Sequence, residues 1–234
     1  MYDTWSPYDP NPADSPGDQA RLRERLQRDQ EIVRAVLPCL RREIENPDRD
    51  MNSVHEALKP YYQQVGRHLP MTPADLPELE ALCWLVLERG GLRQNEIQKV
   101  LLELIGATAA LESVPFLLEM LHYSRRGDHF GPERRQLALW GLARIAIFHN
   151  VPEAYDALQE GLNDRQAEVR GTAANLTLDA YLDAGREVPA GVVDKLRQMA
   201  RSDPDNGVRR TVQRFLREPW ARSYNISEEI TYYE

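Results

Sequence analysis

Apolar residues recur along most of the chain at the spacing that one buried face of an α-helix requires. Counted from an anchor residue, positions +3, +4, +7 and +8 lie on that face. Five stretches follow this pattern, and their anchors are Val54, Ile97, Arg134, Val169 and Val208. Nearly all of the stripe positions are apolar, apart from Gly141 and three threonines. We therefore predict five amphipathic helices that each bury one stripe.

A second regularity predicts another helix ahead of each stripe. Pairs of an aliphatic residue and proline recur every 37–39 residues, at Leu37-Pro38, Leu76-Pro77, Val114-Pro115, Val151-Pro152 and Val188-Pro189. Because the first turn of a helix leaves its N–H groups unpaired, proline is tolerated there, and these pairs predict helix starts. The helical pattern of Gln19–Val36 runs into Pro38, however, so we expect a kink or a break near Leu37.

Each unit thus contains two helices, at a period near 38 residues. In the last three units, the turn between them carries an aspartate, and an arginine follows the anchor: Asp128 with Arg135, Asp164 with Arg170, and Asp203 with Arg209. This pattern resembles the HEAT and HEAT-like helical repeats over about residues 32–217. The match is best in the last two units, whereas His55 replaces the arginine in the first.

The resemblance implies an all-α fold, a right-handed α-solenoid of about five hairpins whose second helices line a concave surface. It also implies that turn aspartates and helix arginines form a ladder between neighbouring units. The period and the missing signature residues argue against tetratricopeptide and ankyrin repeats. No segment alternates apolar and polar residues with a period of two between turn signals, which argues against a β-sheet.

The pattern divides the chain into a repeat domain, residues 19–218, and two tails. Gln19–Val36 is predicted to be an N-terminal cap helix, because terminal units need a polar outer face. Residues 1–18 form a proline-rich acidic tail that we expect to be extended, and residues 219–234 form a tail of aromatic and acidic residues. Either the tails fold back over the ends of the domain, or one of them docks on a partner or another copy.

The formal net charge of −8 argues against a general nucleic-acid binder, because contacts to phosphates need a basic surface. Apolar runs such as Ala81–Leu87 are too short to span a bilayer, and no signal peptide is visible. We therefore expect a soluble, cytoplasmic protein without membrane association. Cys39 and Cys83 suit neither a disulfide framework nor a zinc site and are predicted to be buried.

The sequence lacks the usual motifs of catalysis and phosphate binding. There is no Walker sequence, no Gly-x-Ser-x-Gly and no His-Glu-x-x-His. Gly90-Gly91 lies at a predicted helix end and is expected to form its cap. His122, Asp128, His129 and Glu133 cluster around the longest turn, but their spacing matches no recurring set of metal ligands. We expect no catalytic residues, no metal and no cofactor.

Positions +2 and +6 from each anchor fall outside the buried stripe and are the best candidates for contacts with a partner. The candidate residues are Glu103, Gln136, Trp140, Asn175, Arg210 and Arg214. Trp140 stands out because large aromatic residues and arginines dominate binding hot spots, although it could instead pack between neighbouring units. Residues of the longest turn form a second candidate set: Arg125, Arg126, His129 and Phe130.

These features favour a non-catalytic scaffold or adaptor that binds another protein or a peptide of unknown identity. A homo-oligomer that forms through the tails is also compatible with the sequence. The alternatives are enzymes: the chain could resemble the HEAT-like alkyl-base DNA glycosylases or the HEAT-like chromophore lyases. Its many arginines favour the first alternative, whereas the net charge and the lack of a coherent basic stripe count against it. The second alternative rests on the fold alone.

Overall fold

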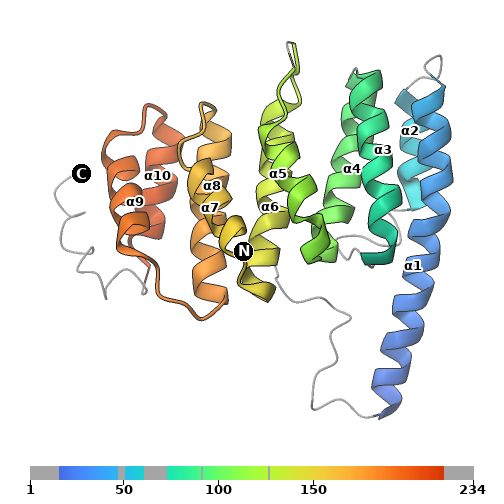
Figure 1. Ribbon diagram of the computed structural model, residues 1–234, viewed down its shortest axis with the longest axis horizontal. Helices are drawn as coiled ribbons and strands as arrows, with labels where there is room; N and C mark the ends of the chain where they lie inside the picture. Colours follow the sequence, from blue (N-terminus) through green and yellow to red (C-terminus); the bar gives the residue numbers. More distant parts are fainter. Residues whose placement is uncertain (1–15, 47–50, 61–72, 91, 126, 219–234) are drawn as a thin grey trace. The chain divides into compact units, whose positions relative to one another are not determined.

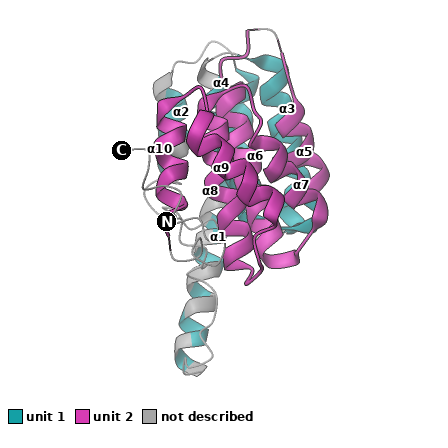
Figure 2. Cartoon of the chain, turned by 90° about the vertical axis from the view of Figure 1, so that its left-hand side faces the viewer, with its two compact units in different colours: residues 1–113 teal, residues 114–234 magenta. Residues whose placement is uncertain are grey.

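The computed structural model describes residues 16–46, 51–60, 73–90, 92–125 and 127–218 of the 234-residue chain (Figure 1). All regular secondary structure within these ranges is helical. The chain divides into two compact units, residues 1–113 and 114–234 (Figure 2). Within the described ranges, no helix is both long enough and apolar enough to cross a membrane.

The first unit contains four α-helices and two short 3-10 helices among its described residues. They are α1 (Pro16–Glu45), α2 (Met51–Pro60), η2 (Pro73–Asp75), α3 (Leu76–Arg89), α4 (Leu92–Thr108) and η3 (Leu111–Ser113). Helix α1 packs against α2 and α3, and α4 packs against α2 and α3. The Arg34 guanidinium on α1 donates two hydrogen bonds, of 2.9 and 3.1 Å, to the Asp75 carboxylate just before α3.

Helix α1 corrects the expectation of a break near Leu37. It continues through Pro38 to Glu45, so the predicted cap helix and the first helix of the first predicted repeat are one element. Val36, Leu37, Leu40 and Ile44 on one face of this helix are buried. Proline removes one hydrogen bond of the helix, and the burial of this apolar face on both sides of Pro38 offsets the loss.

Helices α3 and α4 have the helix start, the glycine cap and the buried stripe that the sequence predicts. Pro77 lies in the first turn of α3, and the helix ends at Gly90, where φ is +66° and the N–H donates to the carbonyl of Val86. This glycine cap with positive φ confirms the prediction for Gly90, and Gly91 lies outside the described residues. On α4 the anchor and its whole stripe are buried: Ile97, Val100, Leu101, Leu104 and Ile105.

Among its described residues, the second unit contains three helical hairpins that follow one another along the chain (Figure 1). They are α5 (Val114–His122) with α6 (Gly131–His149), α7 (Pro152–Gly161) with α8 (Ala167–Asp183), and α9 (Ala190–Ser202) with α10 (Asn206–Phe215). The second helices pack in sequence, α6 on α8 and α8 on α10, and α5 contacts α7. Each aliphatic–proline pair in this unit lies at the start of a first helix, as predicted.

The predicted stripes form the core of these hairpins. The anchors Val169 and Val208 are buried, and so are most stripe positions of α6, α8 and α10, with Leu137 and the threonines Thr172 and Thr211 half-exposed. In the first unit the anchor Val54 is buried, whereas Tyr61 and Tyr62 of its stripe lie outside the described residues.

Candidate functional site

Two arginines of the second helices each reach the turn of the following hairpin. Arg135 on α6 donates to both carboxylate oxygens of Asp164, at 2.6 and 2.9 Å. Arg170 on α8 donates to both carboxylate oxygens of Asp203, at 2.8 and 2.7 Å. Such bidentate, charge-assisted pairs are the strong and geometrically specific form of this interaction. We call these two pairs the turn ladder.

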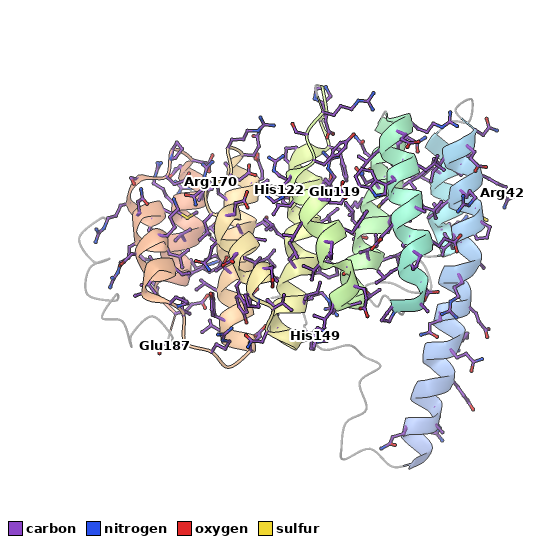
Figure 3. The ribbon with its side chains drawn as sticks, viewed as in Figure 1. Arg42, Glu119, His122, His149, Arg170 and Glu187 are labelled. Carbon is purple, nitrogen blue, oxygen red and sulfur yellow. The ribbon has the colours of Figure 1, made fainter. Side chains whose placement is uncertain are left out.

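The second pair of the turn ladder is buried and fully engaged. The Asp203 side chain is 3% exposed, and Arg170, labelled in Figure 3, also donates to the carbonyl oxygens of Asp164 and Arg165. The hydrogen bonds from Arg170 lower the pKa of Asp203, and the same bonds raise the pKa of Arg170. Because all three of its nitrogens donate to the protein, we assign Arg170 a role in joining hairpins.

The turn aspartates also shape their own turns. Asp164 Oδ1 accepts a hydrogen bond from the N–H of Gln166, and Asp203 Oδ1 accepts one from the N–H of Asp205. Aspartate is favoured at such positions because its short side chain reaches the backbone two residues further on. The third sequence-predicted arginine, Arg209, donates to the backbone carbonyl of Asp203.

The turn between α5 and α6 differs from the pattern, because the anchor itself is charged. Arg134 is 1% exposed, its guanidinium lies over the Tyr123 ring at 4.7 Å, and it is paired with Asp128. Asp128 therefore meets the anchor arginine of its own hairpin, while the neighbouring Arg135 reaches the next turn. The sequence offered two adjacent arginines, and only the packing assigns each to its aspartate.

The candidate contact residues of this turn do not form one surface. Arg125 and His129 are exposed, but Phe130 is only 5% exposed, so its ring is not accessible as a contact residue of this turn. Phe130 directly precedes α6, whose first turn is buried at Gly131 and Arg134, and its ring is buried with that end of the helix. Arg126 lies outside the described residues.

A second set of side chains lies two, six, ten or fourteen places after the anchors of the second helices. We call it the even-helix face: Gln136, Trp140, Arg144 and Phe148 on α6, Asn175 and Asp179 on α8, and Arg210 and Arg214 on α10. The spacing of four places these residues on one face of each helix. Phe148, Arg210 and Arg214 are exposed and the others are half-exposed, so the face as a whole is accessible.

On α6 this face is a continuous strip of aromatic rings and one guanidinium. Arg144 lies over the Trp140 ring at 5.4 Å and over the Phe148 ring at 5.6 Å. Phe148 is 49% exposed, which is unusual for so large an apolar side chain. The strip combines apolar area with positive charge, which is the combination found in binding hot spots.

On α8 the face is acidic. Asn175 Nδ2 donates a hydrogen bond of 2.7 Å to Asp179 Oδ2. Burial, reinforced by the nearby Asp183, raises the pKa of Asp179 from 3.8 to about 6. On α10, Arg210 and Arg214 are exposed, and the Arg214 guanidinium lies over the ring of Phe215 at 5.3 Å. The charge along the face therefore changes from basic to acidic and back to basic.

Sequence reasoning named five of the eight residues of this face, Arg210 and Arg214 among them, and missed three. It named Gln136, Trp140 and Asn175 from positions +2 and +6, but not Arg144, Phe148 or Asp179, which lie at +10 and +14. Continuing the spacing by one or two turns would have found them. Glu103, the remaining candidate, is half-exposed and lies on α4 of the first unit, so it is not one of the residues of this face.

The other chemistry-bearing side chains have structural surroundings. His122, labelled in Figure 3, contacts the Glu160 carboxylate through Nε2 at 3.0 Å and the Leu118 carbonyl through Nδ1 at 2.8 Å. Cys83 is buried as predicted, whereas Cys39 is half-exposed, with its Sγ 3.1 Å from Arg42 Nη2. Cys39 lies on a side of α1 where Ala35, Pro38 and Arg42 are also exposed. In the part of the chain that the structure describes, no three His, Cys, Asp or Glu residues gather as a metal site.

Comparisons with known proteins do not add a function to this geometry. No family model matches the chain, and neither the curated proteins nor the solved structures contain a match to it.

Proposed function

We propose that this chain is a HEAT-like repeat protein that binds another protein or a peptide through the even-helix face. The repeat assignment is supported by three successive hairpins of similar length in the second unit. It is also supported by the turn ladder, in which an arginine of one hairpin holds the turn aspartate of the next. We infer a non-catalytic scaffold or adaptor.

The observation that carries the proposal is the strip of Trp140, Arg144 and Phe148 on α6. Its rings are held by contacts along their own helix and stay partly exposed, so a partner could cover them without first breaking the core. The side chains on α8 and α10 add polar groups that would orient the partner. Interfaces concentrate their energy in such aromatic and arginine anchors, while the surrounding contacts exclude water.

The mixed charge of the face favours a protein over a nucleic acid. Asp179 lies on the central helix, between helices that carry Arg144 on one side and Arg214 on the other. A nucleic-acid groove instead needs a continuous basic track along the phosphates. A protein or peptide with an apolar anchor and both signs of charge is complementary to the face.

Site-specific photocrosslinking tests the proposal in the cells that make the protein. A photoreactive phenylalanine analogue is placed at Gln136 or Asn175 on the even-helix face, and the matched control is Glu119, exposed on α5 (Figure 3). We expect a discrete protein adduct from the face positions and none from the control. Adducts formed equally well from Glu119, or none from the face, would overturn the proposal.

A partner identified from such an adduct allows a quantitative check. Trp140→Ala should weaken its affinity by about 30-fold, the effect of a hot-spot residue worth about 2 kcal/mol. The matched control Glu119→Ala should change the affinity less than twofold. Equal affinities of the two variants would remove Trp140 from the interface.

A further inference from the structure

The second unit leaves large apolar side chains exposed on the helices that form the even-helix face. Phe148 is 49% exposed in the last turn of α6, and Leu182 is 37% exposed in the last turn of α8. Helices α6 and α8 pack against each other, and Trp140 on the same strip is half-exposed. Burying such side chains in contact with another apolar surface is favourable.

The chain itself contains a segment of complementary composition. Residues 219–234 carry one basic residue, Arg222, and three acidic ones, Glu228, Glu229 and Glu234. They also contain six large apolar or aromatic residues: Trp220, Tyr224, Ile226, Ile230, Tyr232 and Tyr233. Glutamates are complementary to the arginines on α6 and α10, and the aromatic and isoleucine side chains are complementary to the Trp140–Phe148 strip.

The place of this segment in the chain favours it over any other part of the protein as the occupant. It follows directly on α10, which is itself a helix of the even-helix face, whereas the other tail precedes α1 in the first unit. Its 16 residues can reach about 50 Å when extended. Three neighbouring helix axes span only about 20 Å, and a short tether gives an effective concentration of about 1 mM.

We propose that residues 219–234 dock in cis on the even-helix face and compete there with the partner proposed above. Ile230 and Tyr232 contact the strip of Trp140, Arg144 and Phe148, and the glutamates pair with the arginines of the face. The competition depends on the proposed function, whereas the docking does not. The segment would then set how readily the face is available to the partner.

Intramolecular crosslinking of the purified full-length chain tests the docking. The photoreactive analogue is placed at Gln136 or Asn175, with Glu119 as the control position, and trypsin releases residues 223–234 as one peptide because no Lys or Arg follows Arg222. Mixing ¹⁴N- and ¹⁵N-labelled chains distinguishes links within one chain from links between copies. We expect links from the face positions to 223–234 within single chains, and none from Glu119.

Variants of the segment separate specific docking from chance encounters. Replacing two apolar anchors together, Ile230→Ser with Tyr232→Ser, should lower the crosslink yield about tenfold. The matched control Thr231→Ser should leave the yield unchanged. Links only between copies, no link to the segment, or equal yields from the two variants would each overturn docking in cis.

The competition is measured separately in cells, so that the two proposals can fail independently. The double variant should increase the partner adduct from Gln136 several-fold, because it releases the face. An unchanged adduct overturns the competition. If the partner adduct forms but purified chains show no link to 223–234, the docking is wrong and the proposed function stands. If the link forms and neither the parent chain nor the double variant gives a partner adduct, the proposed function is wrong and the docking stands.

Discussion

The turn ladder and the even-helix face both belong to the hairpins of the second unit and both contain arginines, but the arginines have opposite surroundings. In the turn ladder, Arg170 is almost completely buried and holds Asp203 with two hydrogen bonds. On the even-helix face, Arg214 is exposed and lies over the ring of its neighbour Phe215. The difference teaches that an arginine within reach of a turn aspartate is buried in an ion pair, as Arg170 is, whereas Arg214, further along its helix, stays accessible to a partner.

The largest effect should come from breaking the turn ladder. Arg170→Ala should lower the free energy of unfolding by about 3 kcal/mol, because it leaves the Asp203 carboxylate buried and unpaired. A charge-assisted bond at the surface would be worth about 1–2 kcal/mol. Urea unfolding followed by circular dichroism measures the change.

Arg214→Ala is the matched control on the even-helix face. It should change the free energy of unfolding by less than about 0.5 kcal/mol, as expected for an exposed side chain. If the two variants lost similar stability, the distinction between the turn ladder and the even-helix face would fail.

The pH dependence of stability should single out Asp179 on the even-helix face. Its pKa is raised from 3.8 to about 6, so the ionised carboxylate is disfavoured in the folded protein. This penalty is complete above pH 6, decreases as the pH falls from 6 towards 3.8, and vanishes below 3.8. Asp179→Asn should therefore stabilise the protein at pH 8 by about 1 kcal/mol, allowing for the solvent that reaches the carboxylate.

Thermal unfolding at pH 8 and pH 4 measures this effect, with Glu187→Gln, an exposed carboxylate in the loop after α8, as the control (Figure 3). The control variant should show no difference between the two pH values beyond that of the parent protein. A stabilisation by Asp179→Asn that persists unchanged at pH 4 would refute the electrostatic explanation.

A small effect on stability should come from the residue with the largest expected effect on binding. Trp140→Ala should lower the free energy of unfolding by less than about 1 kcal/mol, since Trp140 is half-exposed. The matched control on the same helix is Leu142→Ala, whose buried side chain should cost about 3 kcal/mol when truncated. Equal losses in urea unfolding would place Trp140 in the core and weaken the binding proposal.

Much of the fold could be predicted because helix signals are local. The spacing of apolar residues identified the buried stripes of α4, α6, α8 and α10, and the aliphatic–proline pairs marked the starts of α3, α5, α7 and α9. Pro38 misled the prediction, because the burial of Leu37 and Leu40 on either side of it keeps α1 continuous. Local signals cannot include the energy of that burial.

The candidate site could be predicted only in part, for a related reason. The rows at +2 and +6 correctly identified Trp140 and Asn175 as at least partly accessible, but Phe130 is buried although the loop around it is polar. Whether a side chain next to a helix end turns inward depends on the neighbouring elements. The function of the accessible residues stays a prediction.

The sequence by itself determined where the helices of this protein lie and which side of each helix is buried, because backbone hydrogen bonding and side-chain direction repeat within three or four residues. Only the tertiary structure decided that Arg134 meets Asp128 while Arg135 meets Asp164, and that Asp179 is buried enough to raise its pKa. The partner of Arg134 is six residues away in its own hairpin, whereas the partner of Arg135 is 29 residues away in the next one. Local spacing does not decide between two such partners, because the choice depends on how the helices pack.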